Sequence, residues 1–220
     1  MVYALVGDMH VAELWRFPVK SLRGERLAEA ELLAGGIPGD RVVHVRTRDG
    51  RVVTSRIRPH LLSLAGTLGP DGEPLIDGRS WRDPASLQAV REATGADVLL
   101  GRYEELDRFD VLPLCIATDG AIAALRIDGR RLRPNIVVGG VDGLAEREWP
   151  GRRLRIGSAV IEVVKLRARC VMTTFDPDTI EQDRSVLQRI VDVFDGRTAL
   201  DCRVETPGLA AIGDPVELLP

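Results

Sequence analysis

Short β-branched runs separated by turn residues dominate this chain and limit what it can fold into. The clearest pair lies in DRVVHVRTRDGRVVTSRIRP, residues 40–59, where two such runs flank Asp49-Gly50, a strong signal for a tight hairpin. The Gly- and Pro-rich segment AGTLGPDGEPLIDG, residues 65–78, predicts turns between further short strands. Many short strands with few helices favour a mainly β fold, and a β-barrel is the expected architecture.

Three segments predict helices, so the expected class is mainly β with α additions. Residues 83–95 can be capped by Asp83 at the start and ended by Gly95. Residues 120–127 form a second candidate. The third, residues 184–194, carries an apolar stripe at helical spacing. The members of that stripe are Val186, Ile190 and Val193.

Charge and hydropathy exclude several classes of protein. A formal net charge of -3 and a pI near 5.7 argue against a general nucleic-acid binder. No apolar run approaches the ~18 residues that span a bilayer, and MVYALVGDMH at the start lacks the regions of a signal peptide. The cysteines are three in number and widely spaced, which suits a reducing compartment better than a disulfide framework. We therefore expect a cytoplasmic protein that binds neither nucleic acid nor a membrane.

The hairpin register places two arginines in an unusual position. Centred on its two-residue turn, the hairpin has a core face that carries Val43, Val45 and Val52, while His44 alternates with them and is expected to face solvent. Arg41 and Arg56 fall on the same core face, at the open end of the hairpin. Two buried arginines need an anion or carboxylates, because a bare buried charge is very costly. The alternative is that the strands twist and both side chains reach solvent.

Cys170 ends a strand-like run, VIEVVKLRARC, residues 160–170. Strict alternation divides this run into an inward face that ends in Cys170 and an outward face that is expected to meet water. The inward set is Val160, Val164, Leu166, Ala168 and Cys170, and the outward set is Ile161, Val163, Lys165, Arg167 and Arg169. A lone inward cysteine is usually a packing residue. We expect that role for Cys115 and Cys202, with no bond between them.

Six blocks, in order along the chain, resemble the MOSC family, named for the C-terminal domain of molybdenum-cofactor sulfurases. The blocks are FPVKSLRGE at 17–25, GIPGDR at 36–41, VTSRIRPHL at 53–61, LRPNIVVGG with AEREWPGRRLRIG at 132–157, RCVMTTFDPDT at 169–179 and TPGLAAIGDPVEL at 206–218. The resemblance covers nearly the whole chain. It implies a MOSC-type β-barrel, with an N-terminal MOSC-associated β-rich region over residues 1–110 and the barrel core over residues 111–220, or else one compact unit.

The same resemblance implies a molybdenum–pterin cofactor. Members that resemble the amidoxime-reducing component are oxidoreductases that reduce N-hydroxylated or N-oxygenated small molecules. The alternative is a sulfur carrier or a cofactor-binding module without turnover. The chain has no room for a flavin domain and no four-cysteine iron–sulfur pattern, so an enzyme of this kind would need a separate electron-donor protein.

The family motifs carry over to seven residues here. Cys170 would ligate molybdenum and would be the catalytic residue. The residues that would hold the cofactor are Lys20, Ser21, Arg41, Thr118, Arg133 and Asn135. The chemistry agrees, because a phosphate favours arginine, lysine and helix-start amides, and molybdenum favours a soft thiolate. We predict that Arg41 and Arg133 converge with Lys20 on one anion site.

Several positions depart from the family pattern. Ala168 stands where cofactor-binding members often carry serine, and Ala117 also replaces a hydroxyl. Asp119 brings a negative charge to the helix start at which a phosphate is expected. The segment TALDC, residues 198–202, lacks the expected Phe-Gly pair. These departures predict a more open pocket or a cofactor that is held less tightly.

Overall fold

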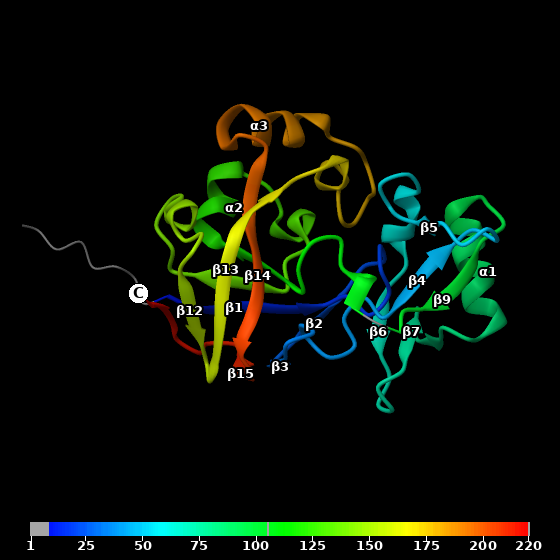
Figure 1. The fold of residues 1–220 in the computed structure, drawn as a ribbon. Coiled ribbons are helices and arrows are strands. Elements are labelled where there is room, and N and C mark those ends of the chain that lie inside the picture. The colour runs from blue at the N-terminus through cyan, green and yellow to red at the C-terminus, as the bar shows by residue number, and fades with distance from the viewer. Residues whose placement is uncertain (1–8, 105, 220) are drawn as a thin grey trace, which may run out of the picture.

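A computed structural model describes residues 9–104 and 106–219, and the mainly β class is confirmed (Figure 1). Its largest sheet has eight strands, antiparallel except for one parallel pair, β10 with β11. In spatial order the strands are β16 (Val216–Leu219), β12 (Arg153–Ile156), β13 (Ala159–Ala168), β14 (Arg197–Thr206), β10 (Leu114–Thr118), β11 (Ile136–Gly139), β1 (His10–Arg16) and β2 (Glu25–Leu27). Apolar side chains of this sheet form the main core of the protein.

The expected β-barrel is not closed by a strand ladder within the described residues. The two ends of the sheet meet at one isolated bridge, between His10 and Pro215. The amide of Val11 also donates to the carbonyl of Asp214 at 2.9 Å. On the other side of this bridge the amide of Val216 donates to the carbonyl of Met9 at 2.8 Å, and the ladder goes no further along β1 because the later half of that strand already pairs with β2.

Two smaller sheets and a helix form the other β-rich part of the molecule, beside the large sheet (Figure 1). The first sheet orders β5 (Val52–Val53), β4 (Val43–Arg46) and β9 (Leu99–Arg102), and the second orders β6 (Gly66–Leu68), β7 (Pro74–Ile76) and β8 (Arg79–Ser80). Helix α1 (Pro84–Thr94) has the predicted ends. The carboxylate of Asp83 accepts a hydrogen bond from the amide of Ala85 at 2.8 Å, and Gly95 adopts φ 60°.

The first strands of the chain pair with strands that come much later. β1 pairs with β11, and β3 (Glu29–Leu32) pairs with β15 (Gly208–Ala211). The large sheet therefore draws strands from both sides of residue 110, where we expected a domain boundary, and that division stays a prediction.

Helices α2 (Asp119–Leu125) and α3 (Arg184–Phe194) lie near one end of the large sheet (Figure 1). A small apolar cluster joins them through Leu125, Val186 and Ile190. Phe194 completes the stripe on α3 at 1% exposure, in place of the predicted Val193, which is 63% exposed. No helix among the described residues is long and apolar enough to cross a bilayer.

The β4–β5 hairpin differs from its prediction by one residue. Val45 pairs with Val53 because the loop has three residues between Thr47 and Arg51, with Gly50 at φ 88°. The shift places Val53 in the core and leaves Val52 exposed.

The prediction that His44 faces solvent was wrong. It is buried, and its ring stacks on Tyr103 at a centroid distance of 4.0 Å. Strand β4 lies between β5 and β9, so both of its edges are paired, and Tyr103 covers the face that carries His44.

The alternation predicted for β13 was also wrong. Ile161 and Val163, expected to face water, are fully buried. The pairing of β13 with β14 shifts register between Val163 and Lys165, and again between Leu166 and Ala168. Burial alternates regularly from Ala159 to Val164, but in the opposite phase to the prediction, which had placed the cations at the end of the run on the side of water.

Candidate functional site

One cavity, lined mainly by positively charged side chains, gathers most of the predicted site residues. We call it the cation-lined cavity. Six of the seven predicted residues line it: Lys20, Ser21, Arg41, Arg133, Asn135 and Cys170. These residues come from four separate parts of the sequence, so only the fold brings them together.

Thr118 does not line this cavity. It is fully buried at the start of α2, where its hydroxyl accepts a hydrogen bond from the amide of Ala121 and donates to the carboxylate of Glu146. The carboxylate of Asp119 accepts from the amides of Gly140 and Val141. Both side chains at this helix start therefore hold neighbouring backbone in place, and the geometry gives no support to a role for Thr118 in cofactor binding.

Three of the lining residues have an unusual backbone. Ser21, Arg41 and Arg133 have φ values of 74°, 55° and 50°, in the left-handed region that favours glycine. Non-glycine residues in that region carry strain, and such strain clusters at functional sites. At Arg133 the conformation ends the 3₁₀ turn η3 (Gly129–Leu132), with its amide bonded to the carbonyl of Arg130.

The predicted convergence of Arg41 and Arg133 is present in the structure. Their guanidinium carbons lie 4.9 and 4.2 Å from the centroid of the Phe17 ring. Among the described residues, the Arg133 side chain makes no hydrogen bond or ion pair. Burial and the nearby Arg41 lower the pKa of Arg133 to about 9, so the side chain remains a cation at neutral pH. A desolvated cation without a partner favours an incoming anion.

Lys20 and Asn135 already have protein partners. The ammonium of Lys20 forms an ion pair with Asp110 at 2.7 Å and donates to the carbonyl of Arg108 at 2.9 Å. Asn135 is 1% exposed, and its amide group donates to the carboxylate of Asp40, at 3.3 Å. Asp40 in turn pairs with Arg41. Asn135 therefore acts on the cavity by holding the partner of Arg41.

Cys170 lies two residues after the end of β13 and directly before the 3₁₀ turn η5 (Val171–Thr174), and it lines the cavity as a half-buried free thiol. Arg167 and Arg169 line the same cavity, although alternation predicted that both face water. Arg167 forms an ion pair with Asp201 at 2.8 Å, and Arg169 donates to the carbonyl of Leu132 at 2.7 Å. The signal available in the sequence was the density of arginine beside one cysteine, and the prediction missed it because it placed these arginines on the face of β13 that meets water.

Cys115 and Cys202 are buried and free, which confirms that no disulfide joins them. Burial raises the pKa of the Cys202 thiol well above its usual value. The neighbourhood of Cys115 differs from the prediction, because its thiol interacts with the guanidinium groups of Arg167 and Arg169.

The charge lining the cavity is strongly unbalanced. Its lining includes six cations, namely Lys20, Arg41, Arg56, Arg133, Arg167 and Arg169, against a single carboxylate, Asp110. The cavity thus suits a ligand with several negative charges, and a phosphate-bearing cofactor fits that requirement. A half-exposed thiol in the same cavity suits a soft metal ion.

A second cavity adjoins the first, and we call it the aromatic cavity. The two share Arg133 and Met172, and the walls of the aromatic cavity include Trp15, Phe17 and Phe175. It offers an apolar surface within reach of the same arginine.

Two family models match this chain. Residues 104–217 match the family model described as MOSC domain, and residues 8–97 match the model described as MOSC N-terminal beta barrel domain. Mitochondrial amidoxime reducing component 2 of Macaca fascicularis is 30% identical, over 79% of this chain and 69% of that protein. Mitochondrial amidoxime-reducing component 1 of Homo sapiens is 25% identical, over 95% of this chain and 82% of that protein. The cytoplasmic location expected from the sequence stays a prediction.

A solved structure supports the fold. The YuaD protein from Bacillus subtilis superposes with a TM-score of 0.53 at 13% identity, over 96% of this chain and 95% of that chain.

Proposed function

This chain belongs to the MOSC family, and from that premise we propose that it binds a molybdenum–pterin cofactor in the cation-lined cavity and reduces N-hydroxylated or N-oxygenated small molecules. The main support is the meeting, in one cavity, of a half-exposed thiol at Cys170 and an unpaired cation at Arg133. The amidoxime-reducing names of the similar proteins agree with this reaction class.

The residues divide into those that hold the phosphate and the one that holds the metal. Arg133 would bind the phosphate most strongly, because it has no hydrogen-bond or ion-pair partner among the described residues to release first. Arg41 would add a second guanidinium while Asp40 and Asn135 keep it in place. Cys170 would ligate molybdenum through its thiolate, since a soft ligand suits that metal.

When bound, the cofactor would supply the two electrons that cleave the N–O bond, and the reaction would also consume two protons and release water. A small-molecule substrate would rest its apolar part in the aromatic cavity, against Trp15 and Phe175. The electrons would come from a separate donor protein, because the sequence contains no second redox motif.

Metal analysis and electron paramagnetic resonance of the purified protein test this proposal. We expect molybdenum in the wild type, a paramagnetic signal on partial reduction, and turnover of an N-oxide with an artificial electron donor. Cys170→Ser changes the volume little and removes the soft ligand, so molybdenum content and turnover should fall together. A matched control is Cys202→Ala, because Cys202 is buried away from the cavity.

Two results would change the assignment. A serine variant that keeps both molybdenum and turnover contradicts the role of Cys170 as ligand. A serine variant that keeps the cofactor and loses only sulfur transfer favours a carrier module without turnover.

A further inference from the structure

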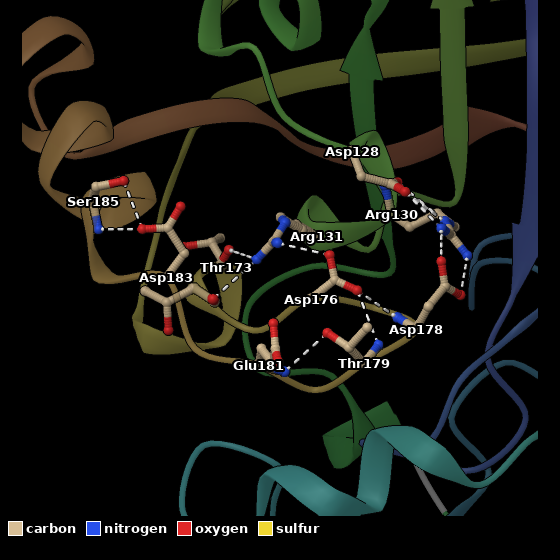
Figure 2. A network of polar contacts seen from close by, with 11 residues as sticks. Asp128, Arg130, Arg131, Thr173, Asp176, Asp178, Thr179, Glu181, Asp183 and Ser185 are labelled. Carbon is tan, nitrogen blue, oxygen red and sulfur yellow. Dashed lines mark hydrogen bonds and ion pairs between the residues drawn. The ribbon is translucent and has the colours of Figure 1, made fainter.

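The segment that follows Cys170 is fastened to the turn that carries Arg133 by a network of polar contacts (Figure 2). Arg131, in η3, points into this segment. Its guanidinium donates to the carbonyl of Thr174 at 2.9 Å and forms an ion pair with Asp176, also at 2.9 Å. The side chain of Arg131 is 10% exposed, so these contacts are largely shielded from water.

The carbonyl that Arg131 binds belongs to the turn that holds Cys170. In that turn the amide and the hydroxyl of Thr173 both donate to the carbonyl of Cys170, at 3.1 and 2.9 Å. The hydroxyl of Thr174 donates to the carbonyl of Val171 at 2.7 Å. These hydrogen bonds connect Thr174 to Cys170 through one short turn. A displacement of the backbone at residue 174 would therefore also move Cys170.

The acidic partner of Arg131 is itself held firmly. One oxygen of the Asp176 carboxylate accepts from the amides of Asp178 and Thr179, both at 3.0 Å, while the other oxygen meets Arg131 (Figure 2). The carboxylate of Asp176 therefore organises this loop. Arg130 makes a second link, to Asp178, but this pair is more exposed and contributes less.

A second contact joins the same two segments, on the N-terminal side of Cys170. Arg169, the residue just before it, donates to the carbonyl of Leu132 at 2.7 Å. Leu132 lies between Arg131 and Arg133 in the sequence. Each segment thus receives a hydrogen bond from an arginine of the other, on the two sides of Cys170, and both contacts lie within two residues of Arg133.

We propose that Arg131 is a positioning residue, which holds Cys170 at a fixed place relative to Arg133 so that the thiol and the unpaired guanidinium line one cavity. Its importance for catalysis rests on the proposed function above. Its effect on Cys170 belongs to the protein alone and can be measured without cofactor.

The test is the rate at which a thiol reagent labels Cys170 in cofactor-free protein, assigned by peptide mass spectrometry. Arg131→Gln should raise this rate about tenfold, the change expected when a shielded, charge-assisted hydrogen bond no longer opposes local opening. Loss of a nearby cation alone disfavours a thiolate and slows labelling. Faster labelling therefore reports loosening and not the change of charge.

The matched control is Arg147→Gln. Arg147 also donates to two backbone carbonyls, those of Phe194 and Arg197, but it does not line the cavity. We expect a similar loss of melting temperature in both variants, with Cys170 labelling in Arg147→Gln within about twofold of the wild type. If Arg131→Gln does not fold, Arg131→Lys replaces it, because lysine can pair with Asp176 but cannot hold both partners in the same fork.

Equal labelling rates in the wild type and the Arg131 variant would overturn the proposal, and so would equal acceleration in the Arg147 control. Molybdenum content gives a separate readout: Arg131→Gln should lose metal that Arg147→Gln retains. If the wild type itself binds no molybdenum, the proposed function fails, while the labelling rates still decide the role of Arg131.

Discussion

Replacing Arg133 by methionine should stabilise the empty protein and weaken its binding of phosphate. The fold keeps this guanidinium charged although burial and Arg41 lower its pKa from 12.5 to about 9. A shift of that size corresponds to at most about 5 kcal/mol of unfavourable free energy. Because the pKa is lower in the folded state, the unfavourable contribution is present in full below pH 9 and is relieved only as the pH rises above it.

Methionine keeps apolar contact with Phe17 and removes the charge. Arg133 is partly exposed, so only about half of that upper bound applies. The lost cation–π contact offsets about 1 kcal/mol of it, and the net stabilisation should be about 1–2 kcal/mol at pH 7. For a chain of this length that is a rise of roughly 3–6 °C in Tm. Loss of a charge-assisted phosphate contact should at the same time weaken binding by about tenfold or more.

Thermal denaturation with and without pyrophosphate measures both effects. The wild type should gain Tm as the anion is added, because a ligand that binds only the folded state stabilises it. Arg133→Met should start higher and gain less. The control is Arg56→Met, since Arg56 lies at the same cavity but is 46% exposed and paired with Asp110. A lower Tm in Arg133→Met, or an undiminished response to pyrophosphate, would refute the reasoning.

Two further predictions concern Glu146 and Ala168. Burial raises the pKa of Glu146 to about 7, so the free energy of unfolding should fall by up to about 3 kcal/mol as the pH rises from 4.5 to 7. Urea denaturation at pH 5 and 8 should show this loss in the wild type and not in Glu146→Gln. An equal loss in both proteins would contradict the prediction. Ala168→Ser places a hydroxyl at an exposed position of the cavity and should slow the loss of molybdenum on dialysis about fivefold. An unchanged rate would show that the hydroxyl has no ligand to bind.

The sequence predicted those elements whose signals are local. Helix α1 begins and ends where Asp83 and Gly95 predicted, because capping depends on a few adjacent residues. The hairpin was placed correctly, but its register was not, because the choice between a two- and a three-residue loop depends on the packing of Val53. The alternation along β13 was assigned the wrong phase, because cations at the end of a strand were expected to face water, and so Arg167 and Arg169 were assigned to the wrong face.

The candidate site was predictable to the extent that family motifs mark it. Motif order named the six residues that the fold brings to one cavity, although no spacing rule joins Lys20 to Cys170. The same reasoning included Thr118, which the structure assigns to the cap of α2. A hydroxyl before a helix looks the same in sequence whether it meets a ligand or its own backbone, so burial had to decide between the two.

The backbone strain at this cavity gives a reason to regard its arginines as retained for binding. Arg41 and Arg133 both occupy the left-handed region, where glycine would relieve roughly 1 kcal/mol or more at each position. Arg133 adds the cost of a desolvated charge without a partner. A fold optimised for stability alone would have glycine or an apolar residue at Arg133, and the empty protein is therefore less stable than its own backbone allows. An anion that binds between these two guanidinium groups would offset both costs at once, which is why we expect ligand-dependent stability to be the most sensitive measure of what this cavity holds.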